Sequence, residues 1–499
     1  MHKEFDWISS RAILYPNDIA IIDATTDDRW TYSEVDRRAE VLATHFVNQG
    51  IKKGDRVALL APNHISYLDF LFAAMKCGAI FVPLNWRLSE EELSYVLGDA
   101  EPTLVGVHES FHRTHEWLGV FGQALEIAGN SYIDQLPTYT ENIFQKPEID
   151  DKDPLAMVYT GGTTGKPKGA VLSHQSIFWN AMNTIVSWDL KRDECTLTSI
   201  PMFHTGGLNA LTTPILLAGG TVVLESDFEP EKAVKNLIKY RCTIVLFIPT
   251  MYHMIVQTDA FQEATFYDME VFLSGGAPCP LSVYEEFNRK GLSFKEGYGL
   301  TEAGPNNFYI DPEMSKVKQG SVGQEMLFNE IRIVRSDGEE VATNEVGELW
   351  LKGKHLFEYY WKNDEETADS FQGEWFVTGD LARKDEDGYV YISGRKKEMI
   401  ITGGENVYPL EIEHWLQSNE KVDEVAVVGI PDDKWGEKVA AFVSVKSEDV
   451  TEEELIRFCE LKLSKYKIPK EFVLMAELPK THVGKIDKKA LLDDYAITE

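Results

Sequence analysis

The sequence has few cysteines, and none of them lies in a metal-binding spacing. Its five cysteines are scattered and form no Cys-x-x-Cys pair, which argues against a zinc knuckle or a disulfide framework. The chain also lacks an apolar run of about 18 residues, the length needed to span a bilayer, and its first residues lack the apolar core of a signal peptide. We therefore expect a cytoplasmic protein without a transmembrane segment.

Basic residues are also in short supply. The chain has 49 Lys and Arg residues against 81 Asp and Glu residues, so its formal net charge is -32 at pH 7. A surface this acidic would repel a phosphate backbone, and we expect no nucleic-acid partner. A few local cations could still hold a small phosphate ligand.

A glycine-rich stretch at residues 159–169, YTGGTTGKPKG, is typical of an anion-binding loop but lacks both common phosphate motifs. A Walker P-loop requires a glycine where Thr160 stands, and a serine or threonine where Pro167 follows Lys166. The fingerprint G-x-G-x-x-G fails as well, because Thr160 takes the place of its first glycine. The loop therefore belongs to another kind of site.

Short apolar runs alternate with amphipathic helical patterns through most of the chain. We predict buried strands at 56–63, 78–85, 155–160, 220–226, 243–250 and 270–276, and helices at 89–100 and 229–241. This alternation predicts an α/β fold in which helices cover parallel-rich sheets. After Phe328, shorter strand–turn units predict a β-rich subdomain.

A compact pattern of helix, two strands and helix begins beyond residue 400. We place the domain boundary at the run Arg395, Lys396 and Lys397. The prediction is a large N-terminal domain, residues 1–395, and a small C-terminal α/β domain, residues 396–499.

Four motifs follow one another along the chain. They are YTGGTTGKPKG, GYGLTEAGP at 297–305, the segment 375–413 that begins WFVTGD, and PKTHVGKIDKKAL at 479–491. Together they strongly resemble the adenylate-forming superfamily, which includes acyl-CoA synthetases, luciferases and the adenylation domains of peptide synthetases. The resemblance covers nearly the whole chain and points to the acyl-CoA synthetase, or fatty-acid–CoA ligase, branch.

The resemblance implies that the first loop holds the β- and γ-phosphates of ATP. Backbone N–H groups, hydroxyls and the charges of Lys166 and Lys168 suit that task. Gly161 stands where the family often has serine, so we expect the backbone alone to make that contact. The implied ATP-binding residues are Thr160, Gly161, Gly162, Thr163, Thr164, Gly165 and Lys168.

In the second motif the resemblance places Thr301 at the α-phosphate and Glu302 on Mg²⁺. A hard cation that shares itself with phosphates prefers such oxygen ligands. An isolated glutamate at this place could instead stabilise the start of a helix. That alternative leaves the neighbouring glycines unexplained.

Further residues are implied in binding the nucleotide. Tyr298, beside Gly299, offers an aromatic face to the adenine, and Asp380 would anchor the ribose hydroxyls. Glycines let a purine approach the backbone closely. Against the other face of the adenine would lie Gly275, Gly276 and Ala277, and Arg395 would make a second nucleotide contact.

The last two motifs contain the residues implied in catalysis and in binding the acceptor, CoA. Attack of a carboxylate on a phosphate brings two anions together, so a cation has to bridge them in the transition state. Lys485 matches the catalytic lysine of the family. Gly403 and Gly404 look like the loop along which the pantetheine arm of CoA passes. In the family the small domain rotates between two half-reactions about a hinge, which here corresponds to Lys397.

The segment around His204 indicates the class of substrate. His204 follows Phe203 at the position where amino-acid-activating domains have an aspartate. We therefore expect an acid without an α-amine, and the resemblance places His204 at the entrance of the acyl pocket. No arginine occurs in residues 203–210, 273–277 or 297–307, which argues against a second carboxylate. The prediction is a medium- or long-chain fatty acid.

The predicted protein is an AMP-forming acyl-CoA synthetase that uses ATP, Mg²⁺, CoA and a small carboxylic acid. Alternatives within this class are an aryl- or coumaroyl-type CoA ligase, a succinylbenzoate CoA ligase and a loader of carrier proteins. A non-catalytic nucleotide-binding protein of the same fold is the alternative from another class. The sequence leaves open whether the protein forms a homodimer.

Overall fold

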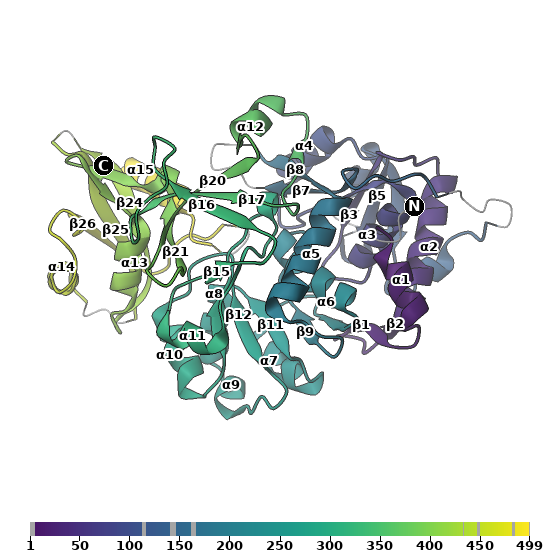
Figure 1. The fold of residues 1–499 in the computed structure, drawn as a ribbon, viewed down its shortest axis with the longest axis horizontal. Helices are drawn as coiled ribbons and strands as arrows, with labels where there is room; N and C mark the ends of the chain where they lie inside the picture. Colours follow the sequence, from purple (N-terminus) through teal and green to yellow (C-terminus); the bar gives the residue numbers. More distant parts are fainter. Residues whose placement is uncertain are drawn as a thin grey trace.

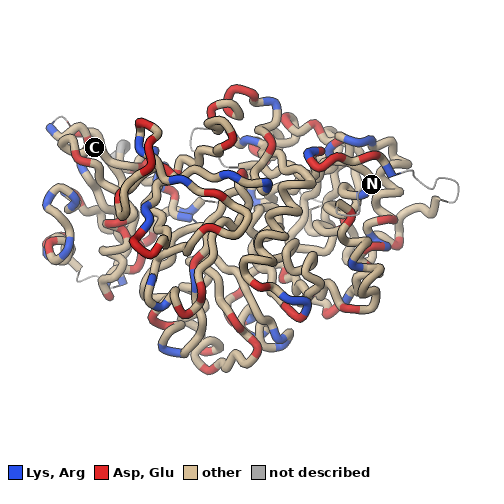
Figure 2. The backbone as a smooth tube through the Cα atoms, viewed as in Figure 1, with Lys and Arg blue, Asp and Glu red and all other residues tan. Residues whose placement is uncertain are grey.

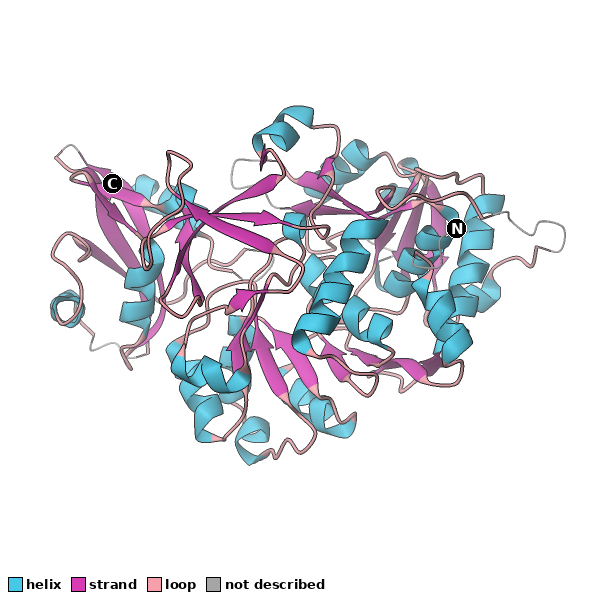
Figure 3. Cartoon of the chain, in the orientation of Figure 1, coloured by secondary structure: helices cyan, strands magenta, loops and turns pink. Residues whose placement is uncertain are grey.

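The computed structural model describes residues 5–111, 116–139, 146–160, 166–432, 434–446, 450–481 and 485–498. In Figure 1 the chain up to β21 forms the larger part of the molecule, and the last elements, α13 to α15 with their sheet, lie together at one end. Figure 3 shows helices lying against sheets throughout. This arrangement confirms the predicted mixture of parallel-rich sheets, a β-rich subdomain and a small C-terminal α/β part.

A first seven-stranded sheet carries the loops that contain the predicted site residues Gly275–Ala277 and Tyr298–Glu302. Its strands are, in spatial order, β13 (Phe294–Glu296), β12 (Val271–Ser274), β11 (Ile244–Phe247), β9 (Cys195–Thr198), β10 (Thr221–Leu224), β1 (Ile19–Asp23) and β2 (Arg29–Thr31). All neighbours are parallel except β1 and β2. Parallel strands end at the same edge of a sheet, and ligands of open α/β sheets bind beyond that edge.

A second seven-stranded sheet holds the glycine-rich hairpin. Its strands are, in spatial order, β18 (Tyr359–Tyr360), β8 (Lys168–Ser173), β7 (Pro154–Thr160), β4 (Ile80–Pro83), β3 (Arg56–Leu60), β5 (Leu104–His108) and β6 (Gln123–Ile127). The hairpin β7–β8 and the short β18 are antiparallel, and the other pairs are parallel.

Helices cover both sheets, and a shared core of aliphatic and aromatic side chains fills the space between these layers. In the N-terminal part they are α1 (Trp7–Leu14), α2 (Tyr32–Asn48), α3 (Ser66–Cys77), α4 (Glu90–Ala100), α5 (His174–Trp188), α6 (Thr212–Ala218), α7 (Pro230–Lys239), α8 (Pro249–Val256), α9 (Asp259–Glu263), α10 (Leu281–Arg289), α11 (Pro312–Val317) and α12 (Asp364–Asp369). None of the helices in the described ranges is long and apolar enough to cross a membrane.

The β-rich subdomain is an antiparallel sheet. It contains β16 (Glu330–Val334), β17 (Gly347–Lys352), β20 (Trp375–Lys384), β19 (Phe371–Gln372) and β21 (Val390–Arg395), and a separate pair joins β14 (Phe308–Tyr309) to β15 (Gln324–Glu325). The long strand β20 pairs with β21 so that Asp380 lies opposite Arg395. Two predicted site residues are thereby brought together by strand register.

The C-terminal elements form a sheet and cores of their own. The strands are β22 (Ile400–Thr402), β23 (Glu405–Val407), β24 (Val422–Asp432), β25 (Gly436–Val445) and β26 (Glu471–Met475), and the helices are α13 (Pro409–Gln417), α14 (Glu452–Glu460) and α15 (Lys488–Thr498). The two core clusters of this region contain only residues from 400 onward. Acidic and basic residues are spread over both parts of the chain in Figure 2.

Candidate active site

The glycine-rich loop is held by a regular hairpin. Strands β7 and β8 pair down to Thr160 and Lys168, which lie opposite each other where the loop leaves the sheet. The Thr160 hydroxyl donates a hydrogen bond to the Lys168 carbonyl, at 3.4 Å. The predicted phosphate contacts Gly161, Gly162, Thr163, Thr164 and Gly165 lie outside the described residues.

The two lysines of this motif point in different directions. Lys166 lies over the ring of Tyr95, with its Nζ 5.1 Å from the ring centroid. Lys168 forms an ion pair with Glu366 of α12, and its Nζ lies 5.5 Å from the centroid of the Tyr360 ring. Of the two lysines, Lys168 is the one that lies over the ring of Tyr360, and the hydroxyl of Tyr360 contacts Glu302 of the second motif.

Glu302 occupies a short 3₁₀ turn, Thr301–Ala303, beyond strand β13. The Tyr360 hydroxyl donates a hydrogen bond of 2.7 Å to Glu302 Oε1. The backbone carbonyl of Glu302 accepts a hydrogen bond from the N–H of Phe357. Burial raises the pKa of the Glu302 carboxyl, because desolvation disfavours the charged form. A buried carboxylate beside the Thr301 hydroxyl fits Mg²⁺, which binds proteins through one or two carboxylates and shares phosphate oxygens.

Asp380 lies at the meeting point of three elements. The Tyr298 hydroxyl donates to its Oδ2 at 2.6 Å, and the Nε of Arg395 donates to its Oδ1 at 2.9 Å. The Asp380 side chain is 7% exposed and that of Arg395 is 49% exposed. Burial raises the pKa of Asp380, while Arg395 and the Tyr298 hydroxyl act in the opposite direction. The structure thus joins three residues that the sequence analysis assigned to one nucleotide.

The loop Gly275–Ala277 leaves the sheet at the end of β12, next to the motif that follows β13. Gly276 has φ +84°, in the left-handed region that favours glycine. At Gly299 a Cβ atom would lie 2.2 Å from the carbonyl carbon of Pro305. Both loops therefore need glycine to keep their backbones this close.

His204 follows strand β9 at the start of an irregular helix, Gly206–Ala210. Its ring packs on Phe203, with centroids 4.4 Å apart, and its Nε2 has no hydrogen-bond partner among the described residues. Burial lowers its pKa to about 3, and the nearby charges of Lys485 and Arg87 act in the same direction. His204 is therefore a neutral imidazole at physiological pH.

Lys485 is surrounded by charged groups of the same site. Desolvation and the neighbouring Arg395 lower its pKa, while Asp380 and Glu398 partly offset that effect. Because Lys485 also acts on the pKa of His204, it lies within electrostatic reach of both the proposed ribose anchor and the acyl entrance. The lysine of the C-terminal motif therefore belongs to the same cluster of charged groups.

Gly403 and Gly404 take no part in this cluster. They form the turn between β22 and β23, where a Cβ on Gly403 would lie 3.0 Å from the ring of Trp435. Trp435 is itself 39% exposed. The structure therefore brings together Lys485 and the nucleotide residues and leaves the Gly403–Gly404 turn elsewhere on the C-terminal part.

Three residues of the site were missed by sequence reasoning. Tyr360 and Glu366 lie far along the chain from the motifs that they contact. Arg87 influences the pKa of His204 but belongs to none of the three segments that were searched for arginine. The aromatic Trp86 beside it packs on Phe203, which could have marked this segment as part of the pocket wall.

Two adjacent glycines next to His204 differ in the space around them. A Cβ on Gly207 would lie 2.3 Å from the carbonyl oxygen of Pro201 and 2.5 Å from that of Ile200, whereas on Gly206 it would meet nothing closer than 3.9 Å. We expect Gly207→Ala to lower the free energy of unfolding by about 1–3 kcal/mol, the usual cost of overpacking. Urea denaturation of both variants tests this, with Gly206→Ala as the matched control. Equal stability of the two variants would contradict it.

Known proteins resemble this chain over almost its whole length. A profile of the AMP-binding enzyme family matches residues 9–361, and one of the AMP-binding enzyme C-terminal domain matches residues 411–485. Feruloyl-CoA synthase of an Amycolatopsis species is 36% identical over 97% of each chain. Long-chain-fatty-acid–CoA ligase FadD13 of Mycobacterium tuberculosis is 34% identical over 99% of each. The structure of o-succinylbenzoate CoA synthetase of Bacillus subtilis with ATP and a magnesium ion has a TM-score of 0.87 at 29% identity, covering 98% of this chain and 99% of that one.

Proposed function

The chain belongs to the AMP-binding enzyme family and is an AMP-forming acid–CoA ligase that uses ATP, Mg²⁺ and CoA, and from this premise we propose the class of acid that it activates. The acid that the geometry supports best is a medium- or long-chain fatty acid. The observation that carries this proposal is a small cavity behind Gly206, which is lined by four aliphatic side chains and three threonines and lies close along the chain to His204.

In the first half-reaction a carboxylate oxygen of the acid attacks the α-phosphorus of ATP. A new O–P bond forms, and the bond to pyrophosphate breaks. Lys485 would bridge the two anions, and the Thr301 hydroxyl would hold an α-phosphate oxygen. Asp380 would anchor the ribose, and Mg²⁺ held at Glu302 would supply positive charge to the phosphates. The neutral His204 would line the path of the acid without attracting a second anion.

In the second half-reaction the CoA thiol attacks the carbonyl carbon of the acyl adenylate. A C–S bond forms, the acyl–oxygen bond breaks, AMP leaves with the electron pair, and the thiol proton passes to solvent. The turn at Gly403 and Gly404 would admit the thin pantetheine arm. Because that turn packs on Trp435 and takes no part in the cluster around Asp380 in this structure, the C-terminal part, residues 396–499, would have to move relative to residues 1–395 between the two steps.

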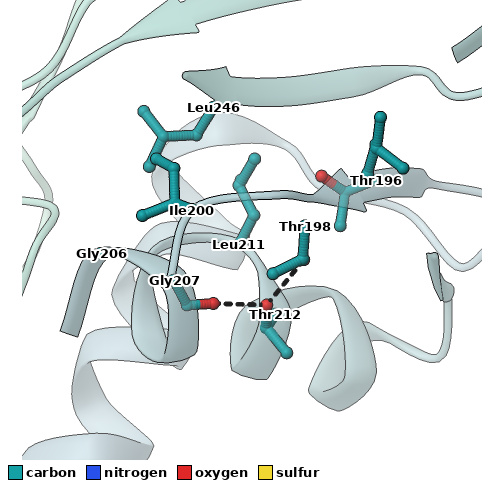
Figure 4. A pocket seen from close by; sticks show the side chains of 9 residues that line it. Thr196, Thr198, Ile200, Gly206, Gly207, Leu211, Thr212 and Leu246 are labelled. Atoms are coloured by element: carbon teal, nitrogen blue, oxygen red, sulfur yellow. Dashed lines mark hydrogen bonds between the residues drawn. The ribbon is translucent and has the colours of Figure 1, made fainter. Parts of the chain in front are cut away.

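Four aliphatic side chains and three threonines line the cavity behind Gly206. Figure 4 shows Ile200, Leu211 and Leu246 around it, and Leu197 completes the apolar lining. The hydroxyls of Thr198 and Thr212 lie 3.0 Å apart, and Thr212 also donates to the Gly207 carbonyl at 2.7 Å. Because these two hydroxyls bond within the protein, they are not free to bind a polar group of the acid.

The proposal predicts that kcat/KM rises with the chain length of the acid. Each buried methylene contributes about 0.8 kcal/mol, so kcat/KM should rise roughly fourfold per methylene until the cavity ends. The measurement is thioester formation with CoA over acids from acetate to palmitate, together with benzoate, coumarate, ferulate and 2-succinylbenzoate. A maximum at acetate, a dicarboxylate or an aromatic acid would reject the fatty-acid assignment.

A substitution at Gly206 adds a test of the cavity itself. A side chain there would point toward Ile200, so Gly206→Val should shift the optimum to shorter acids and leave the KM for ATP unchanged. An unchanged chain-length profile would show that the acid lies elsewhere.

A second candidate is an aryl acid of the ferulate type. One observation favours it: the buried hydroxyl of Thr196 lines the cavity and has no hydrogen-bond partner among the described residues. A phenolic hydroxyl could satisfy it, and feruloyl-CoA synthase is among the relatives. If ferulate outperforms every fatty acid, and Thr196→Val removes that advantage, this candidate replaces the first.

A further inference from the structure

We propose that Glu366 sets the affinity of the site for the triphosphate of ATP by holding Lys168 in an ion pair that the phosphates must displace. The inference rests on the proposed function, because it takes Lys168 as a residue that binds the triphosphate of ATP. The two residues are 198 positions apart and belong to different motifs. Their contact is a property of the fold.

Lys168 is held with its ammonium group beside the carboxylate of Glu366 and the ring of Tyr360. It is the first residue of β8, and its backbone pairs with Thr160 across the hairpin. Its side chain is 22% exposed, and that of its partner Glu366 is 41% exposed. A pair that is this accessible contributes little by itself and can be exchanged for a stronger anion.

The position of Glu366 is defined by its backbone. Strand β18 pairs with β8, so that Tyr360 lies opposite Ala170, and α12 begins four residues later. The Asn363 side chain caps this helix by accepting from the N–H of Glu366 at 3.2 Å, and the N–H of Tyr360 donates to Thr367 Oγ1 at 2.9 Å. The carboxylate therefore meets Lys168 from a fixed support.

Tyr360 connects this pair to the proposed magnesium carboxylate. One face of its ring lies against the Lys168 ammonium, and its hydroxyl donates to Glu302. A triphosphate that extends from Glu302 toward Lys168 would pass beside this ring. Lys168 would then have two competing anions, the phosphates and Glu366.

The surroundings of Lys168 add to this competition. Helix α12 contains Asp364, Glu365, Glu366 and Asp369 and no basic residue, and it is mostly red in Figure 2. Like charges near a polyanion weaken its binding. Of these four acids only Glu366 has a described ion pair with Lys168, so its charge should matter most.

The test is Glu366→Gln, which removes the charge and keeps the shape. We expect the KM for MgATP in pyrophosphate release to fall about fivefold with kcat unchanged, since one exposed ion pair no longer has to be broken. Calorimetric titration should show the same tightening for MgATP and none for AMP, which lacks the β- and γ-phosphates. A merely structural role would move both nucleotides together.

The matched control is Glu365→Gln, which removes the same charge from the neighbouring position of α12. It should leave the KM for MgATP nearly unchanged, and the effect of Glu366→Gln should disappear when Lys168 is also changed to Met. A higher KM in Glu366→Gln, an equal shift in the control, or a shift that persists without Lys168 would overturn the inference. If the unaltered enzyme bound no MgATP, the proposed function itself would fail.

Discussion

Replacing Lys485 with alanine should abolish formation of the acyl adenylate and spare formation of the thioester from supplied acyl adenylate. The structure places Lys485 within electrostatic reach of Asp380, Arg395 and His204, where the two reacting anions would meet. Loss of a cation that stabilises developing charge should slow the first half-reaction by about 10²-fold or more. The measurement is pyrophosphate release for the first step and thioester yield from synthetic acyl adenylate for the second.

Lys489→Ala is the control for this variant. Lys489 belongs to the same motif, is exposed and is the second residue of α15, so it reports on loss of positive charge from the C-terminal part alone. Both half-reactions should survive in it. If Lys485→Ala slowed both half-reactions equally, the lysine would serve folding or domain position instead of the adenylation step.

Replacing Lys397 with proline should leave adenylation largely intact and severely slow thioester formation. Lys485 lies within electrostatic reach of Asp380 and Arg395, whereas the turn at Gly403 and Gly404 packs on Trp435. One rigid arrangement cannot present both to the same acyl group, so we infer that the part beyond Lys397 rotates between the steps. Proline restrains φ near -65° and restricts the residue before it, which removes the freedom that a hinge needs.

Ion pairs on either side of Lys397 support this position for the hinge. Lys396 pairs with Glu348 of β17 at 3.0 Å, and Glu398 pairs with Lys488 of α15 at 3.0 Å. The residue before Lys397 is therefore tied to the N-terminal part, and the residue after it to the C-terminal part. A rotation centred on Lys397 would keep both pairs.

The hinge variant is judged by timing the two half-reactions separately. Lys397→Ala, which removes the charge but leaves the backbone free, should affect thioester formation much less than Lys397→Pro. Thioester formation at the unaltered rate in the proline variant would place the hinge elsewhere. Loss of adenylation in that variant would show that proline disturbs the arrangement seen here.

The secondary structure of the site followed from local patterns in the chain. The apolar run at 243–250 forms β11, the run at 270–276 forms β12, and the pattern at 89–100 forms α4 with a capping box at Ser89 and Glu92. Side-chain periodicity and capping act between residues a few positions apart, so such patterns are readable without tertiary information. The sheet order then brought the loops after β12 and β13 to one edge.

The sequence by itself determined the family, the α/β fold and the residue types that a nucleotide site requires, because motif order and hydrophobic period are local properties of the chain. Only the tertiary structure decided that Tyr360 contacts Glu302, that Glu366 holds Lys168, and that Lys485 comes within electrostatic reach of Asp380. These contacts join residues on separate strands and helices, and they depend on which elements become neighbours and in what register. Sequence spacing does not encode that choice, because it arises when the sheets pair and the C-terminal part docks.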